Sequence, residues 1–136
     1  MEKPKNKNTK AYENWEIWKL KNQCLRLWKL VVKKNAGGKC EACEDEERLN
    51  AHHIEDERLC PALRYDPRNG VGLCPTNHKF GKDSFHRSFI FAYNFMMKKR
   101  PLDLVYLKEH RNDKIKITKE YLLDQINSLE NELKRV

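Results

Sequence analysis

The sequence has no long run of apolar residues, and only 39% of its residues are hydrophobic. No segment approaches the roughly 18 consecutive apolar residues that a membrane-spanning helix needs. The polar N-terminus also lacks the pattern of a secretory signal peptide. These absences argue against a membrane or exported protein and predict a soluble, cytoplasmic one.

An even set of cysteines is also missing, because the chain has five. An odd count fits poorly with a closed disulfide framework. Cys40 and Cys43 have Cys-x-x-Cys spacing, which in a cytosolic protein indicates metal binding or redox chemistry. No βαβ pattern surrounds the pair, so metal binding is favoured over a redox role.

Glycine and proline are scarce, with five of each, and neither occurs between residues 11 and 34. Apolar residues recur in this segment at steps of three and four, which predicts one long helix over 11–34 that ends at Gly37 and Gly38. Its three tryptophans predict a core seam, with stacking on nucleic-acid bases as the less favoured use. Cys24 falls within the apolar pattern and is expected to be a small buried hydrophobe.

The middle of the chain carries two short strand patterns separated by a long loop. Residues 48–54 and 71–73 predict the strands of an irregular hairpin, and the loop 55–70 between them is rich in turn residues. Pro75 then stands where a helix can begin, with His78 in its first turns.

Three further helices are expected after the hairpin, and they make the fold class α+β, mostly helical. The first is rich in aromatic and methionine residues, the second is short, and the third follows a threonine that can cap it. They cover residues 84–99, with Asp83 or Ser84 as the cap, 102–107, and 119–136, with Thr118 as the cap.

The last of these helices carries an apolar seam with heptad spacing. Two heptads are too few for a secure isolated coiled coil, so packing onto the same chain, against the tryptophan helix, is the default expectation. A homodimer through residues 119–136 is the runner-up. The seam consists of Leu122, Ile126, Leu129, Leu133 and Val136.

Positive charge exceeds negative charge, with 28 lysines and arginines against 20 acidic residues and a formal net charge of +8. A basic chain commonly binds polyanions, because contacts with phosphates release condensed counterions. Lysines solvated on helix faces account for the same charge equally well. The basic residues gather in the tail 1–10, which is expected to be disordered, in residues 19–34, and at Lys98, Lys99 and Arg100.

Residues 52 to 78 combine the side chains that carry the most chemistry. The adjacent pair His52 and His53 is followed by Asn69 and then by His78. Cleavage of a phosphodiester needs an activated water, neutralised charge at phosphorus and a stabilised leaving oxygen. A neutral imidazole can activate the water, and a divalent ion can meet the other two needs. Neighbouring side chains on a strand point to opposite faces, so the adjacent histidines are expected to do different jobs.

The motifs around these residues resemble the HNH endonuclease family. They are Ala51-His52-His53-Ile54, the segment from Leu63 to Val71 that contains Asp66-Pro67-Arg68-Asn69-Gly70, and Leu73-Cys74-Pro75 followed by His78. The resemblance is closest to small HNH proteins of bacteriophages and mobile elements, and it covers about residues 25–97. It implies a ββα-metal finger, a bacterial host cell and double-stranded DNA as the partner.

The resemblance also implies a role for each residue of the site. His53 would be the general base, His52 and His78 would hold a single divalent ion, and Asn69 would brace the loop that orients His53. His86, in a Ser-x-His sequence, is a candidate third ligand, and a capping or surface histidine is an equally good interpretation. Imidazole ligands leave the choice among Mg, Mn, Ni and Zn open. The implied products carry a 5′-phosphate and a 3′-hydroxyl.

One part of the family pattern is incomplete in this chain. Many members hold a structural zinc with two Cys-x-x-Cys pairs, but here Asn77 stands in the fourth place. Structural zinc takes four closed ligands. The opposing interpretation is that the cysteines pack beneath the tryptophan helix. The zinc ligands present would be Cys40, Cys43 and Cys74. The fourth ligand would be Cys60, His86 or a water, and without a fourth ligand the site is degenerate and empty.

Arg64 and Arg68 lie in the loop beside the expected site. They are candidates to bind the DNA backbone, because the guanidinium fork fits phosphate oxygens. The competing interpretation is that this loop is held together by an Arg–Asp pair and the buried ring of Tyr65.

The sequence therefore predicts a metal-dependent DNA endonuclease in three parts: the tail 1–10, an HNH nuclease domain over 11–100 and a helical extension over 101–136. The alternative is a non-catalytic zinc-binding, DNA-binding module, but such a module does not need histidines and an asparagine at these intervals. A toxin-like nuclease with an inhibitor partner is disfavoured, because no translocation or secretion segment is visible.

Overall fold

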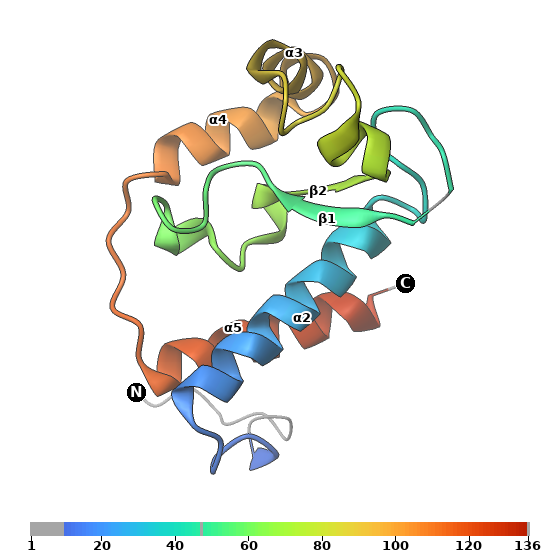
Figure 1. Ribbon diagram of the computed structural model, residues 1–136. Helices are drawn as coiled ribbons and strands as arrows, with labels where there is room; N and C mark the ends of the chain where they lie inside the picture. Colours follow the sequence, from blue (N-terminus) through green and yellow to red (C-terminus); the bar gives the residue numbers. More distant parts are fainter. Residues whose placement is uncertain (1–9, 47, 136) are drawn as a thin grey trace.

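The computed structural model describes residues 10–46 and 48–135, so the predicted tail 1–10 lies outside the described residues apart from Lys10. The fold is α+β and mostly helical, as expected (Figure 1). Its main elements are helices α2 (Ile17–Asn35), α3 (Phe89–Lys99), α4 (Pro101–His110) and α5 (Lys119–Lys134), and strands β1 (Asn50–His53) and β2 (Gly70–Leu73).

Helix α2 is shorter than predicted. It begins at Ile17 rather than at residue 11, because residues 11–14 form turns. It ends at Asn35, before Gly37 and Gly38. Their positive φ angles of 70° and 76° stop the helix, as expected.

The predicted tryptophan seam is only partly buried. Trp28 and Cys24 are fully buried, as expected of core residues, whereas Trp18 is 57% exposed. Trp18 precedes Cys24 by six residues, which places the two side chains about 120° apart around the helix. The prediction of one seam for all three tryptophans is therefore wrong at Trp18.

Helix α5 runs beside α2 in the same direction (Figure 1). The Cys24 thiol faces the Leu122 carbonyl near the start of α5, and Lys34 donates to the Glu132 carbonyl near its end. Thr118 caps the helix, as expected. Leu122, Ile126 and Leu129 of the seam are buried in the core that α2 forms and Leu133 packs against it, so packing on the same chain is confirmed for these residues, whereas Val136 lies outside the described residues. A homodimer through residues 119–136 stays a prediction, and it would use the more polar outer face of α5.

The hairpin lies directly against α2. Its strands pair antiparallel within the predicted ranges, extended by one residue at Gly70, which pairs with His53. A Cβ at Gly70 would lie 2.2 Å from Val32 Cγ2, and a Cβ at Gly72 would lie 2.7 Å from Ala36 Cβ. The two glycines thus permit a helix-to-sheet approach that larger residues would block.

A single wide turn follows β2 where a helix was expected. It covers Thr76–Phe80 and is π-helical, with Pro75 at its N-cap and His78 inside it. Gly81 N closes the turn with a 2.8 Å hydrogen bond to the Thr76 carbonyl. The hairpin followed by this single turn does not confirm the ββα-metal finger that the resemblance implies.

Helix α3 begins later than predicted. Its first residue is Phe89 and its cap is Ser88, so the predicted start at residue 84 and the caps Asp83 and Ser84 are wrong. The Ser84 hydroxyl does accept a hydrogen bond from Arg87 N, but it closes only one turn, because the backbone is extended at Ser88 and the helix starts after it. Residues 84–87 therefore form a turn ahead of the helix.

A second core lies between the hairpin, α3 and α4. Helix α4 extends beyond the predicted 102–107 in both directions. Pro101 at its first position presets a helical φ, which accounts for the earlier start. Cys40 and Cys74 pack in this core and not beneath the tryptophan helix, so that interpretation of their role is wrong. The core comprises Cys40, Cys60, Leu63, Val71, Leu73, Cys74, Phe95, Met96 and Leu107.

Arg100, expected in a basic cluster, instead holds this second core together. Its guanidinium donates to the Gly70 carbonyl at 2.6 Å and pairs with Asp103 at 2.7 Å and Glu41 at 3.4 Å. Glu41 also accepts a hydrogen bond from Gly72 N at 2.6 Å. These contacts join the cysteine knuckle of residues 40–43, the hairpin and the start of α4.

None of the described helices combines the length and the apolarity needed to cross a membrane. The division into a domain over 11–100 and an extension over 101–136 stays a prediction. In the structure, α5 of the proposed extension shares the first core with α2.

Candidate functional site

His52 and His53 leave β1 on opposite faces, as the alternation of a strand requires. The His53 ring stacks on Trp28 of α2, with the ring centroids 3.8 Å apart and the planes at 5°. The His52 ring contacts His78 and His86 instead, each with its centroid 4.9 Å away. The adjacent histidines therefore belong to two different groups of side chains.

The imidazoles of His52, His78 and His86 converge on one point. One ring nitrogen from each lies within 4.8 Å of the other two. The Nε2 atoms of His78 and His86 are 3.0 Å apart. Two imidazoles bound at right angles to one ion, each about 2.1 Å from it, have nitrogens about 3.0 Å apart, so this spacing fits a shared cation. The expected ligands His52 and His78 meet, and His86 joins them.

A short segment carrying His86 folds back along the turn that carries His78. His86 N donates to the His78 carbonyl at 3.1 Å, and Phe85 N donates to the Asn77 carbonyl at 2.8 Å. The Phe85 ring also packs edge-on against His52, with centroids 5.4 Å apart. Backbone bonds and an aromatic contact thus place all three imidazoles. The sequence signal for His86 is the Ser-x-His pattern.

The electrostatic environment favours neutral rings in this group. Burial, together with the neighbouring imidazoles, lowers the pKa of His52 to about 3 and the pKa of His78 to about 4. Both rings are therefore neutral at pH 7 and offer the lone pairs that metal binding requires. The buried Nδ1 of His78 has no hydrogen-bond partner among the described residues. The three imidazoles thus make a group that could hold a divalent ion.

His53 is held both on its face and at one ring nitrogen. Its face lies on Trp28, and its Nε2 lies 2.8 Å from the Arg64 carbonyl oxygen and 3.4 Å from a Glu57 carboxylate oxygen. Because a carbonyl oxygen accepts and never donates, Nε2 carries the proton and the Nδ1 lone pair is free to accept one. Burial lowers the pKa of His53, which favours its neutral, basic form.

His53 and the three-imidazole group line the same cleft, which has a volume of about 580 Å³. The walls of the cleft also carry charges of both signs, from Asp56, Glu57, Arg58 and Lys79. A phosphate and a water bound at the three imidazoles would share this space with His53.

Asn69 is fully buried and ties the loop to the end of β1. Its Oδ1 accepts a hydrogen bond from Glu55 N at 2.7 Å, and its Nδ2 donates to the carbonyls of Glu55 and Leu63 at 3.1 Å each. Arg64, whose carbonyl faces His53, directly follows Leu63 in the chain. The geometry is that of a brace, and a part for Asn69 in catalysis stays a prediction.

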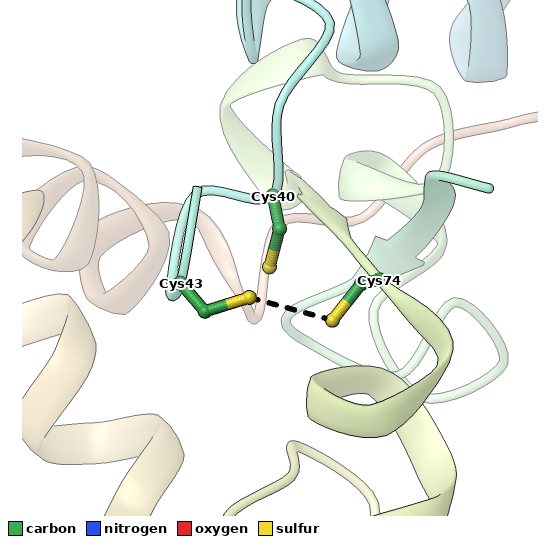
Figure 2. A group of neighbouring side chains, drawn as sticks. All are labelled: Cys40, Cys43 and Cys74. Atoms are coloured by element: carbon green, nitrogen blue, oxygen red, sulfur yellow. Dashed lines mark hydrogen bonds between the residues drawn. The ribbon is translucent and has the colours of Figure 1, made fainter. Parts of the chain in front are cut away.

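Three cysteines form a second group that could hold a metal ion (Figure 2). The thiols of Cys40, Cys43 and Cys74 point toward one another, and the Sγ atoms of Cys43 and Cys74 are 3.6 Å apart. Burial raises the pKa of Cys40, but backbone N–H groups of Cys74, Cys43 and Ala42 outweigh it and lower the pKa overall. Since the thiolate is the form that binds metal, this lowering favours Cys40 as a ligand. Burial and the neighbouring thiols instead raise the pKa of Cys43 to about 11, so in the metal-free protein Cys43 is a thiol at pH 7.

Asn77 stands where a fourth ligand would lie. Its Oδ1 is 3.4 Å from the Sγ of Cys40 and 3.2 Å from the Sγ of Cys74. Cys60 does not join the group, because its thiol faces a glutamate carboxylate instead. His86 belongs to the three-imidazole group. Neither of these two candidates completes the thiolate site.

Arg64 and Arg68, the candidate DNA ligands, both have partners within the protein. Arg68 lies over the Tyr106 ring at 3.9 Å and pairs with Asp103 at 2.7 Å. Arg64 donates to the Glu57 carbonyl at 3.1 Å. Contact of these arginines with DNA stays a prediction.

Trp28 and Glu57 are neighbours of His53 that the sequence does not indicate. Apolar periodicity marks Trp28 and assigns it to the core, where it is also found. Glu57 follows His53 by four residues, a spacing that brings side chains together on a helix, but here the chain leaves a strand. Nothing in the sequence connects residue 28 with residue 53.

Comparisons of the chain with protein-family models, with curated proteins and with solved structures find no match. The function is therefore argued from the two candidate metal sites, the cleft and the residues that surround them.

Proposed function

We propose that the protein is a metal-dependent DNA endonuclease of the HNH type, which hydrolyses phosphodiester bonds to a 5′-phosphate and a 3′-hydroxyl. The observation that carries this proposal is the convergence of His52, His78 and His86 in a cleft that His53 also lines. A site that merely binds a cation has no need of a further imidazole, oriented separately and with a free lone pair.

Each residue of the site has a role in this reaction. His52, His78 and His86 hold a divalent ion, which supplies a Lewis acid for the scissile phosphate and the leaving oxygen. His53 accepts a proton from the attacking water through Nδ1, because its Nε2 already donates to the Arg64 carbonyl. Asn69 keeps the loop, and with it this carbonyl, in place.

The cysteine group is proposed as a structural zinc site. Cys40, Cys43 and Cys74 give three thiolates, and the Asn77 amide oxygen or a water completes four ligands. Such a site would tie the knuckle to the end of β2, immediately before the turn that carries His78. Because the second core is small, a metal clip would contribute directly to its folding.

Double-stranded DNA is the proposed substrate because the chain carries a net charge of +8. On α2, the exposed Lys29 and Lys33 pair with no carboxylate among the described residues, so their charge is available to phosphates. Contacts of this kind supply affinity and register but no sequence readout.

A plasmid-nicking assay with Mg²⁺, Mn²⁺, Ni²⁺ and Zn²⁺ tests the proposal. The wild-type protein is expected to nick supercoiled DNA with at least one of these metals, and DNA ligase should reseal the nicks because they carry 5′-phosphate and 3′-hydroxyl ends. His53→Ala should still bind DNA but lose metal-dependent nicking. His110→Ala is the matched control, since His110 pairs with Asp113 outside the cleft.

The second candidate function is a non-catalytic zinc-binding, DNA-binding module. The cysteine group favours it, as does the single π-helical turn where the finger helix is expected. Under this alternative, wild-type protein binds DNA and zinc but nicks with none of the four metals. Nicking by His53→Ala at the wild-type rate would remove His53 from its role.

A further inference from the structure

Trp28 of α2 provides a rigid, flat surface for His53. The imidazole lies face to face on the indole, with the ring centroids 3.8 Å apart and the planes at 5°. The indole is fully buried, and its Nε1 donates to the Asp66 carbonyl at 2.9 Å. Packing and a hydrogen bond therefore fix the plane on which His53 rests.

Gly70 leaves the space that this arrangement needs. It pairs with His53 across the hairpin, and a Cβ there would lie 2.9 Å from Trp28 Cζ2 and 2.2 Å from Val32 Cγ2. The absence of a side chain thus lets α2 approach the end of β1 closely enough for the rings to stack. Residues from α2, β1 and β2 build the stack together.

We infer that Trp28 is a positioning residue for His53 in phosphodiester hydrolysis, an inference that rests on the proposed function. The Arg64 carbonyl and the Glu57 carboxylate hold one edge of the ring, but both contacts are made at Nε2 and leave the ring free to tilt about that atom. The indole face removes that freedom. The Nδ1 lone pair then stays in one direction, as a general base requires.

The 5° angle between the Trp28 and His53 rings distinguishes a residue that positions His53 from one that only fills space in the core. The other ring contacts around the site are steep: His52 meets His78 at 64°, His86 at 63° and Phe85 at 76°. A tryptophan that merely fills volume can meet a neighbour at any such angle. The nearly coplanar contact is the one that fixes the plane of an imidazole.

Steady-state kinetics of plasmid nicking by Trp28→Leu and Trp28→Phe test the inference. Trp28→Leu keeps an apolar side chain but no flat face, and its kcat is expected to fall about 10- to 100-fold while KM changes less than about twofold. Trp28→Phe keeps a flat ring and should restore most of the lost rate. Trp18→Leu is the matched control, because Trp18 is exposed on the same helix.

Proton NMR reads the stack without relying on activity. The His53 ring protons, assigned by their loss in His53→Ala, should be shifted upfield by the indole ring current in the wild-type protein and in Trp18→Leu. The shift should disappear in Trp28→Leu. If urea unfolding shows that Trp28→Leu is not folded, Trp28→Met replaces it, since the flexible thioether adapts to an irregular space and has no flat face.

The outcomes distinguish this inference from the proposed function. A folded Trp28→Leu protein with wild-type kcat overturns the inference and leaves the nuclease proposal intact. Parallel losses of kcat, DNA affinity and metal affinity also overturn it, because Trp28 would then support the whole fold. A wild-type protein that nicks DNA with none of the four metals overturns the nuclease proposal, and the stack is then structural.

Discussion

At the scale of the residue, one step along the chain separates the two tasks that we propose for the candidate site. His52 faces the group of imidazoles, and His53 faces α2, because side chains on a strand alternate. A ligand has to give its lone pair to a cation, and a general base has to keep its lone pair for a proton. Placing the two on opposite faces of one strand prevents them from competing for the same ion.

The low pKa values of His52 and His78 predict that the metal-free protein loses stability in mild acid. Both groups have a folded pKa well below the ordinary 6.5, about 3 and about 4. As the pH falls from 7 to 5, the unfolded chain takes up protons at these positions while the folded chain does not, so unfolding becomes more favourable. We expect the two histidines together to lower the free energy of unfolding by about 1–2 kcal/mol over this range, allowing for solvent screening around the less buried His78.

Urea unfolding at pH 7, 6 and 5 in the presence of a chelator measures this loss. The double variant His52→Asn/His78→Asn should show a flatter dependence on pH than the wild-type protein. His110→Asn, which alters a histidine outside the cleft, should keep the wild-type slope. Equal slopes for all three proteins would contradict the prediction.

The sequence predicts the role of a side chain when that role depends on residues nearby in the chain, and not when it depends on packing between distant segments. The split between His52 and His53 follows from strand alternation and was predictable from the sequence. The stack on Trp28 was not, because it depends on how α2 packs across the hairpin and on the space left at Gly70. Long-range packing of this kind leaves no periodic trace in the sequence.

At the scale of the element, periodicity predicted the long helices well and turn chemistry predicted the short ones poorly. The end of α2 and the cap and seam of α5 follow from glycine, threonine and apolar spacing. Helix α3 starts late because the backbone is extended at Ser88, and the π-helical turn Thr76–Phe80 is held by hydrogen bonds from Phe85 N and His86 N. Tertiary contacts override local preference at both places.

The incomplete cysteine site gives a prediction at this scale. Asn77 already lies within 3.4 Å of the Cys40 sulfur and 3.2 Å of the Cys74 sulfur, so its position is suited to a ligand. Asn77→Cys would supply a fourth thiolate in place of a weaker amide or water ligand. We expect zinc affinity to rise at least about tenfold, equivalent to about 1.4 kcal/mol.

Competition with a chromogenic zinc chelator at pH 7 measures that gain. Cys43→Ser is the opposite control and should lower zinc affinity and the thermal midpoint together, because binding energy at a structural site is folding energy. Cys60→Ser should leave zinc affinity unchanged, since Cys60 lies outside the group. An Asn77→Cys protein that binds zinc no more tightly than wild type would contradict the prediction, because residue 77 would then not occupy a ligand position.

At the scale of the whole molecule, two neighbouring residues link the two candidate metal groups. Asn77 contacts the thiols and His78 belongs to the imidazoles, and both lie in the turn Thr76–Phe80. A metal clip at the thiols would therefore fix the turn that positions one ligand of the other group. We therefore expect a metal bound at the cysteine site to stabilise the position of His78 in the cleft.

The charge of the molecule as a whole leads to a prediction about DNA binding. Lys29 and Lys33 lie four residues apart on the exposed face of α2, whereas Lys34 donates to carbonyls at the end of α5. Each phosphate contact contributes about 0.9 to the slope of log affinity against log salt concentration. In a His53→Ala background, which leaves the DNA uncut, the double variant Lys29→Gln/Lys33→Gln should reduce this slope by about 1.8. Fluorescence anisotropy between about 50 and about 200 mM salt, the range over which such contacts are strongly screened, measures this slope.

Lys34→Gln is the control and should leave the slope unchanged, because the Lys34 ammonium group is engaged within the protein. If the double variant keeps the wild-type slope, α2 does not contact the DNA backbone, and the basic charge of this helix is solvated.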